Sequence, residues 1–427
     1  MLVSALIILL GLIALSIPVA TALGSLGLIL AQIYSRMPVH RAIGDISWQT
    51  SIEFLLVAIP MFVMLGEILL RSGIAAKMYD AMVKWLSWLP GGLMHSNIGS
   101  CALFAATSGS SVATAATIGT VAEPEMRKHK YNEPLFLGTI AAGGTLGILI
   151  PPSINLIVYG LLTNTSVSEL YLAGFIPGFL LAALFMATVA VACIIRPEWG
   201  GTKTPYSWAE RFACLVHLVP PILIFLVVVG SIYAGWATPT GAASLGVVAS
   251  LILAAAHRRL SLEMLRAVFK GTMRTTGIIM LIIVAAVFLN FVLATIGLTT
   301  QLTDYIVSLG LSPLGTLLLI IAFYLVLGCF METFSMLITT ATIVTPIVVG
   351  MGYDPVWFGV LLMVLLETAL ITPPIGINLF VVQSIRTSGE LKDVMIGALP
   401  FVITMFAMVV LLIAFPQLAL WMPKLFY

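Results

Sequence analysis

The sequence predicts an all-α polytopic membrane protein made of two inverted repeats, each with a re-entrant hairpin and a broken helix. Three observations lead to this fold class. Of the 427 residues, 61% are hydrophobic and only 8% are charged, whereas a soluble domain carries about 25% charged residues. Several apolar stretches reach the roughly 20 residues that a helix needs to span a bilayer. Finally, four short motifs of the first half recur in the same order in the second half.

The long apolar stretches predict nine membrane spans. The first has no basic segment before it and no small-residue cleavage site after it, so we interpret it as a retained span and not as a signal peptide. The nine spans are 3–29, 51–70, 135–160, 169–195, 214–233, 238–257, 275–296, 356–383 and 396–420.

Two further apolar regions, 93–125 and 313–349, are interrupted at their middles by small and polar residues. This pattern predicts pairs of short helices joined by a tip inside the membrane. Lys84 precedes the first region and Arg127 follows it, so the positive-inside rule predicts a hairpin with both ends in the cytoplasm. The flanks of the second region carry no Lys or Arg, which predicts entry from the opposite face.

With nine spans and these hairpins, the N-terminus is predicted in the cytoplasm and the C-terminus in the periplasm. Arg36 and Arg41 are the exception, because this topology places both cations outside. No run of basic and aromatic residues indicates nucleic-acid binding.

The recurring motifs indicate an internal repeat. Because the charge pattern gives the two copies opposite topology, the repeat is predicted to be inverted, which together with discontinuous helices is typical of secondary transporters. The paired motifs are 73–80 with 297–304, 116–120 with 341–345, Pro151-Pro152 with Pro373-Pro374, and 154–156 with 377–379.

The repeat divides the chain into scaffold and transport parts. Segments 74–90 and 298–309 show amphipathic spacing and are interpreted as interfacial arm helices. The parts are 1–92 (first-repeat scaffold spans and arm helix), 93–168 (first hairpin and broken helix), 169–312 (scaffold spans and second arm helix), 313–395 (second hairpin and broken helix) and 396–427 (last span).

The hairpin tips are rich in hydroxyl groups, which together with freed carbonyls are ligands for a hard cation such as sodium. Close packing of small residues between helices is the alternative interpretation. We predict one sodium ion at each tip, at least two in all. The predicted ligands are Ser108, Gly109, Ser110, Ser111, Gly144 and Gly147 at the first tip, and Glu332, Thr333, Ser335, Thr372 and Gly376 at the second.

The two proline pairs are predicted to break their helices, because proline lacks an amide donor and clashes with the preceding turn. A mere kink is the alternative. Each break exposes the positive end of a half-helix, where an anionic substrate would bind. Intramembrane acids are functional candidates, and Glu367 is one besides Glu332, whereas Glu53 and Glu67 are predicted to be interfacial. The predicted substrate residues are Pro152, Ser153, Asn155, Pro374 and Asn378.

Three segments, 108–119, 144–154 and 370–380, resemble the large membrane subunit of the TRAP (tripartite ATP-independent periplasmic) transporters. The resemblance covers essentially the whole chain. It implies an elevator-type symporter of the bacterial inner membrane, driven by sodium, that imports a carboxylate of the sialic acid or C4-dicarboxylate type. It also implies two partners, a periplasmic substrate-binding protein and a small four-helix membrane subunit. In the family's second tip Met-Asp is expected where this chain has Met331-Glu332.

Other functions fit the sequence less well. A stand-alone sodium/divalent-anion symporter shares most of the features above. An intramembrane enzyme with a nucleophile in Ser108-Gly109-Ser110 would need a nearby histidine, but the five histidines lie at span ends or in loops. A channel does not explain hairpins on both faces, and no ATP-binding motif of the GxxxxGK[ST] kind occurs.

Overall fold

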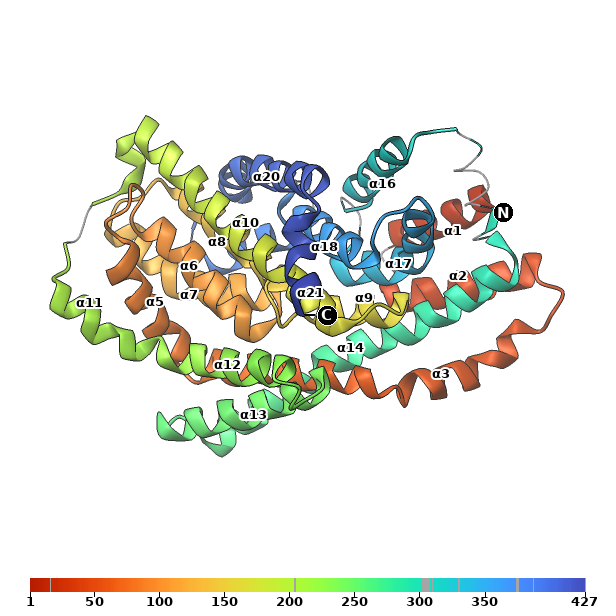
Figure 1. Cartoon of the computed structure of the whole chain (residues 1–427), viewed down its shortest axis with the longest axis horizontal. Helices are drawn as coiled ribbons and strands as arrows, with labels where there is room; N and C mark the ends of the chain where they lie inside the picture. The colour runs from red at the N-terminus through yellow and green to blue at the C-terminus, as the bar shows by residue number, and fades with distance from the viewer. Residues whose placement is uncertain are drawn as a thin grey trace.

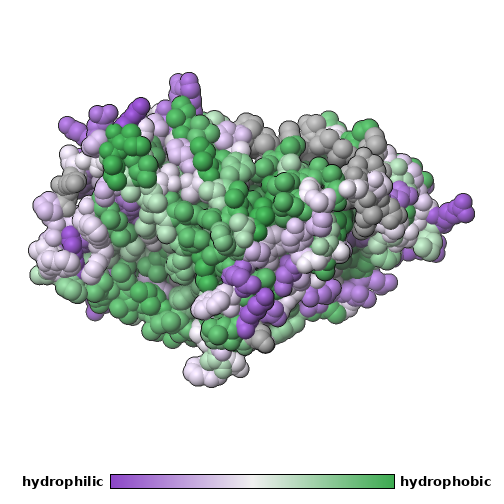
Figure 2. Space-filling model, turned by 45° about the horizontal axis from the view of Figure 1, so that its top comes forward, coloured by the Kyte–Doolittle hydropathy of each residue, from purple (hydrophilic) through white to green (hydrophobic). Residues whose placement is uncertain are grey.

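The computed structural model describes residues 1–427 except 16, 203–204, 299, 302–307, 309, 329–330, 374–375, 387 and 427. Within the described residues every regular element is helical. Six of these helices are long and apolar enough to cross a membrane, and two further bent pairs qualify as broken spans. Figure 2 shows broad stretches of hydrophobic residues on one face, with hydrophilic residues gathered in separate groups. An all-α polytopic membrane protein is therefore confirmed.

The helices form two layers, which lie one above the other in Figure 1. The lower layer, here called the scaffold, contains α2, α4, α12, α13 and α14, which pack side by side. The upper layer, here called the hairpin bundle, contains α6–α10 and α16–α20. The scaffold helices are α2 (Val19–Tyr34), α4 (Ala58–Arg71), α12 (Val219–Tyr233), α13 (Pro239–Ala256) and α14 (Leu262–Thr295).

Both predicted hairpins are present as helix pairs. In the first pair α6 (Leu93–Ser108) and α7 (Ser111–Lys128) are separated by only two residues. The second pair consists of α16 (Pro313–Gly328) and α17 (Thr333–Gly350). The first interruption falls on Gly109 and Ser110, and the second helix of the second pair begins directly after Glu332.

Both predicted broken helices are also present. The chain leaves α8 at Leu149, passes the two prolines with the Pro151–Pro152 peptide in cis, and enters α9 with a bend of 42°. A second break separates α18 from α19. These are therefore breaks and not kinks. The four half-helices are α8 (Glu133–Leu149), α9 (Ile154–Thr163), α18 (Pro355–Ile371) and α19 (Ile377–Ile385).

Two long helices accompany the broken ones. α10 (Val167–Ile195) and α20 (Leu391–Ala414) pack on α8 and α18, so they lie with the hairpin bundle. The sequence-based division had given 169–195 to the scaffold and 396–427 to a separate last span. Hydropathy alone does not distinguish these neighbours, because both layers offer apolar surfaces.

The interfacial arms are only half described. The first arm is α5 (Ile74–Leu86), which packs on α6 and α7. Its Tyr79 hydroxyl donates to Asn97 Oδ1 at 2.8 Å, and both side chains are buried. Most of the second predicted arm, 298–309, lies outside the described residues.

The prediction of a single first span over 3–29 is wrong. The chain forms α1 (Leu2–Ala14), turns before Pro18, and returns as α2. The Ser4 hydroxyl lies 2.7 Å from the Tyr34 hydroxyl, so the ends of this helical pair meet. Pro18, which starts α2, is the sequence signal for the turn. The first half thus begins with two antiparallel helices, as the second half does with α12 and α13.

One helix of each pair packs on a long scaffold helix of the other half, α2 on α14 and α13 on α4. A Cβ at Gly27 of α2 would lie 3.0 Å from the Phe288 ring of α14, and one at Gly246 of α13 would lie 3.1 Å from the Leu65 side chain of α4. Each half therefore supplies a glycine-bearing helix to the other half. The contact occurs twice in the same form.

The contact between α2 and α14 also shows their relative direction. Gly24 faces Ala285 and Gly27 faces Phe288, so α2 and α14 run parallel. α14 begins in a basic segment with Arg266, Lys270 and Arg274. Residue 34 and the chain's N-terminus consequently lie at the end of α14 that is remote from these cations.

This arrangement predicts which sites label from the same face. In a cysteine-free background, Met37→Cys and a cysteine added before Met1 should react with an impermeant reagent from one face, and Lys128→Cys from the other. The exposed Met37 and Lys128 keep the substitutions outside the core. The sequence analysis, which placed the N-terminus and the ends of the first hairpin both in the cytoplasm, predicts the opposite result. Labelling of the N-terminal and 128 sites from the same face would support that prediction and contradict the helical pair as oriented here.

Candidate functional site

Both hairpin tips face one cavity of about 440 Å³ between the hairpin bundle and the scaffold. Three sets of residues line it. The first tip contributes Ser108, Gly109, Ser110, Ser111, Val112, Ala113 and Ala116; the second tip and the helices before and after the breaks contribute Ile148, Ile154, Asn155, Glu332, Thr333, Phe334 and Leu370; the scaffold contributes Val63, Gly66, Glu67, Leu70, Thr275, Ile278, Ile279 and Ile282.

The first tip is a two-residue turn whose conformation requires glycine. Gly109 ends α6 in the left-handed region with φ +62°, and Ser110 starts α7 by accepting a 3.4 Å hydrogen bond from the Ala113 amide. A Cβ at Gly109 would lie 2.6 Å from the Pro152 carbonyl oxygen. The tip therefore touches the break between α8 and α9, which the sequence had placed opposite it.

The same tip packs on the glycines of α8. A Cβ at Gly147 would lie 2.6 Å from the Ser110 carbonyl oxygen, and one at Gly144 would lie 3.2 Å from the Ser111 carbonyl oxygen. The Ser111 hydroxyl donates to the Thr145 carbonyl at 3.3 Å. The structure thus brings together all six residues that the sequence assigned to the first tip. Close packing accounts for Gly144 and Gly147, and the carbonyl oxygens of Ser110 and Ser111 lie against these two glycines.

The start of α9 supplies an unpaired donor. Ser153 begins the helix by accepting from the Leu156 amide at 3.3 Å. Asn155, in the first turn, is 1% exposed, yet its Nδ2 has no hydrogen-bond partner among the described residues. A buried donor without a partner costs about 1–3 kcal/mol. Because Asn155 lines the cavity, a bound ligand is the natural partner for this amide.

The second tip has a carboxylate at the start of α17. Glu332 accepts from both the Ser335 amide at 3.1 Å and the Ser335 hydroxyl at 3.2 Å. Thr333 is 3% exposed and its hydroxyl has no partner among the described residues. Glu332 thus acts as a helix cap, and Thr333 presents a second unpaired polar group to the cavity.

The second break is arranged differently from the first. The Thr372 hydroxyl donates to the Thr368 carbonyl of its own helix at 2.6 Å, and Gly376 starts α19. Asn378 Nδ2 donates to the Ala141 carbonyl of α8 at 3.2 Å, so this side chain ties α19 to α8. None of these three residues lines the cavity, and the predicted substrate residue Pro374 lies outside the described residues.

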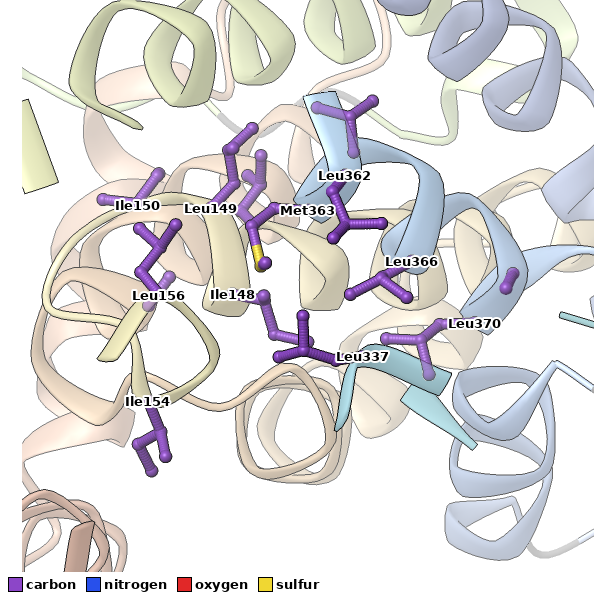
Figure 3. Close-up of a cluster of buried hydrophobic side chains, with 14 of the residues drawn as sticks. Ile148, Leu149, Ile150, Ile154, Leu156, Leu337, Leu362, Met363, Leu366 and Leu370 are labelled. Carbon is purple, nitrogen blue, oxygen red and sulfur yellow. The ribbon is translucent and has the colours of Figure 1, made fainter. Parts of the chain in front are cut away.

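Behind the cavity the two broken helices meet. Figure 3 shows Ile148 of α8 close to Leu337 of α17, with Leu366 and Leu370 of α18 beside them. Within this apolar cluster the fully buried Glu367 accepts from the Ile148 amide at 3.0 Å. Its other oxygen has no partner among the described residues. Glu367 therefore joins the two breaks without facing the cavity.

The sequence analysis did not predict that scaffold residues form one wall of the cavity. Glu67 was predicted to be interfacial, but it lines the cavity while pairing with Arg71 at 2.9 Å. Its neighbour Gly66 abuts the first tip, since a Cβ there would lie 3.5 Å from the Ser108 carbonyl oxygen. Glycine beside an acid in the apolar segment 58–70 was the only available signal.

The family model of the tripartite ATP-independent periplasmic transporter DctM component matches residues 6–418. The chain belongs to this family. A C4-dicarboxylate TRAP transporter large permease protein of Pseudomonas aeruginosa is 32% identical over 378 residues, which are 88% of each chain. A sialic acid large permease of Vibrio cholerae is 32% identical and covers 88% of this chain and 87% of its own length.

Relatives of the DctM family differ in their named substrates. An ectoine large permease of Halomonas elongata is 29% identical over 87% of this chain and 86% of its own. The crystal structure of the YdaH transporter of Alcanivorax borkumensis has the same fold, with a TM-score of 0.68 at 14% identity, over 96% of this chain and 99% of that one. DctM-family proteins are transport permeases and not enzymes.

The serine residues of the first tip have structural partners. The Ser108 hydroxyl lies 3.1 Å from the Thr114 hydroxyl, and Ser110 caps α7. The alternative of a serine nucleophile is set aside because the chain belongs to a family of transport permeases.

The contact between Gly109 and Pro152 can be tested with a matched glycine. Gly235 is also left-handed, with φ +71°, but a Cβ there would meet nothing within 4 Å. Gly235→Ala should cost only the conformational term of about 1–2 kcal/mol, whereas Gly109→Ala must also displace the break. We expect a clearly lower thermal unfolding midpoint for Gly109→Ala in detergent. Equal midpoints would show that the tip and the break are not in contact.

Proposed function

We propose that the chain is the substrate-translocating large subunit of a sodium-driven symporter that imports a carboxylate across the bacterial inner membrane. The observation that supports this best is the shared cavity, where two hairpin tips and a helix break meet beside the unpaired Asn155 amide. Oxygen ligands for cations and a donor for an anion line one cavity. A cation and an anion bound there would neutralise each other.

The first sodium ion would bind where the tip rests on α8. The C-terminal ends of α6 and α8 both reach this point, and helix C-termini carry unpaired carbonyls and negative partial charge. Hydroxyl and carbonyl oxygens of Ser108, Ser110 and Ser111 surround it. Because the Ser111 hydroxyl donates its hydrogen bond to the Thr145 carbonyl, the lone pairs of its oxygen remain available to a cation. The glycines Gly109, Gly144 and Gly147 allow the approach.

The second ion would bind at the other tip. Glu332, Thr333 and Ser335 supply oxygens there, and Thr372 and Gly376 belong to the facing break. Since the Thr372 hydroxyl also donates within its own helix, it too can offer a lone pair. The resemblance leads us to expect aspartate at this position, and the Glu332 side chain is one methylene longer.

The substrate carboxylate would bind at the start of α9. The first amides of a helix and its positive dipole end favour anions, and Pro152, Ser153 and Asn155 belong to this segment. A bound sodium ion adds positive charge close by, so sodium should strengthen binding of the carboxylate. Thermodynamic linkage requires the carboxylate to strengthen sodium binding by the same factor.

Movement of the hairpin bundle along the scaffold would carry the bound groups across the membrane. The two halves repeat the same order of elements, and opposite orientation of the repeats would give the alternating access of an elevator. The scaffold wall of the cavity consists of Gly66, of the apolar Ile278, Ile279 and Ile282, and of a few other residues, and it is the surface along which the hairpin bundle would move. A periplasmic binding protein would deliver the substrate, and a small four-helix membrane subunit would be the second partner.

Sodium dependence at the first tip can be measured without knowing the substrate. Ser110→Ala removes a proposed ligand, and Thr120→Ala removes a hydroxyl from the exposed side of the same helix. We expect Ser110→Ala to raise the sodium concentration for half-maximal thermal stabilisation about threefold to tenfold, with Thr120→Ala unchanged. The reference salt is choline chloride.

Thr372→Ala should act in the same direction at the second tip. If neither Ser110→Ala nor Thr372→Ala changes the sodium dependence, the ions do not bind at these tips. If sodium does not stabilise the unmodified chain more than choline does, the sodium-driven mechanism itself is wrong.

A further inference from the structure

A second cavity, of about 650 Å³, lies at the end of the scaffold and has no part in the proposed transport cycle. It forms where α2 ends and the chain turns into the short helix η1 (Val39–Ala42) and then α3 (Ile43–Ser51). Figure 1 shows this turn at the right-hand end of the scaffold, on the same side as the N-terminus. Ala31 and Val39, which line the cavity, are buried, whereas most of its other lining residues are exposed. The cavity is therefore a hollow on the outside of the protein.

The charged groups at this cavity are cationic or can become so. Arg36 and His40 line it, and no aspartate or glutamate does so among the described residues. Both side chains are exposed, and neither forms an ion pair within the described part of the chain. A guanidinium matches the oxygens of a phosphate group in pairs, and a histidine can donate a hydrogen bond in either protonation state. The cavity thus offers donors for an anion.

These cations lie on the side of the membrane where cations are rare. The topology predicted from the sequence and the parallel course of α2 and α14 both place residue 36 on the face remote from the basic start of α14. Arg36 and Arg41 thus oppose the usual bias of Lys and Arg toward the cytoplasm. Tyr34 and the 69% exposed Trp48 of α3 flank them, and such aromatic residues are typical of the membrane–water boundary. An anionic ligand at this boundary would account for the unusual charge.

The side of the cavity that faces the membrane interior is apolar. Leu28 and Ile33 of α2 line it and are 43% and 56% exposed. Because a helix rises about 1.5 Å per residue, Leu28 lies about 9 Å from the end of α2 at Tyr34. Donors for a phosphate group therefore lie at one end of the cavity, and hydrocarbon extends from them into the bilayer.

We infer that this cavity binds an anionic phospholipid of the outer leaflet, with its phosphate at Arg36 and His40 and its acyl chains along Leu28 and Ile33. The inference goes beyond the proposed function, since it does not depend on the substrate or on sodium. The exposed hydrocarbon favours a lipid over a free anion. A protein partner at the same place would have to supply an acid for Arg36.

Two lipids with the same acyl chains test the headgroup. The full-length chain is purified in detergent, and its thermal unfolding midpoint is measured with added dioleoylphosphatidylglycerol or dioleoylphosphatidylcholine at constant sodium chloride. A cation near a lipid surface contributes a factor of about five in affinity. We expect half-maximal stabilisation by the phosphatidylglycerol at a concentration about fivefold lower than by the phosphatidylcholine. Potassium phosphate at the same phosphate concentration should leave the midpoint unchanged.

Variants at an exposed position test the site without disturbing the core. Arg36→Gln should bring the ratio between the two lipids close to one, and Arg36→Lys should retain most of it. Arg266→Gln removes the same charge from an exposed position in the first turns of α14 and should leave the ratio as it was. Because Arg36 is exposed, the midpoint without lipid should be the same in all three variants as in the unmodified chain.

Three results would overturn the inference. Equal potency of the two lipids on the unmodified chain would leave the cavity to a protein partner. Stabilisation by potassium phosphate as strong as that by the lipid would identify a site for a free anion. An equal loss of lipid preference in Arg36→Gln and Arg266→Gln would show general surface attraction and no built site. None of these results bears on sodium binding at the hairpin tips, so the proposed function is tested separately.

Discussion

Backbone amides and carbonyls cannot be left unpaired in hydrocarbon, and this constraint governs where the chain stops being helical. Among the described residues, Gly109 and Ser111 of the first tip, Pro151 and Pro152 of the first break and Thr333 of the second tip are buried within the protein. At the first tip the carbonyl of Pro152 lies so close to Gly109 that a Cβ would not fit. Each interruption thus shields the other from the bilayer. The cavity exists because these interruptions converge, and the polar groups they release are what a ligand can use.

The sequence was sufficient for the interior of the hairpin bundle. Glycine at position 109, the proline pairs and the recurring Ile-Asn-Leu motif act through local backbone chemistry, so both hairpins and both breaks could be predicted, as could the meeting of the first tip with Gly144 and Gly147. The ion and substrate roles of these residues remain proposals. The prediction of one span over 3–29 failed because hydropathy does not record direction, and a turn at Pro18 leaves the apolar content unchanged.

The two asparagines show a further limit of prediction from sequence. Asn155 and Asn378 occupy the same place in the motif, yet Asn155 lines the cavity without a partner while Asn378 donates to the Ala141 carbonyl of α8. Repetition in sequence predicts equal local structure but not equal surroundings. Glu67 illustrates the converse case. Its position near a span end says nothing about a cavity whose other walls come from distant helices.

In the scaffold each half of the chain packs on a helix of the other half, and this has a consequence for how the protein is made. α4 completes its packing only with α13, and α2 only with α14, which are synthesised after the whole first hairpin and broken helix. Until α13 and α14 have been inserted, Gly27 and Leu65 therefore lack the partners that they have in the finished structure. The first half cannot close upon itself, so biogenesis commits the chain to completing both halves before either has its final neighbours.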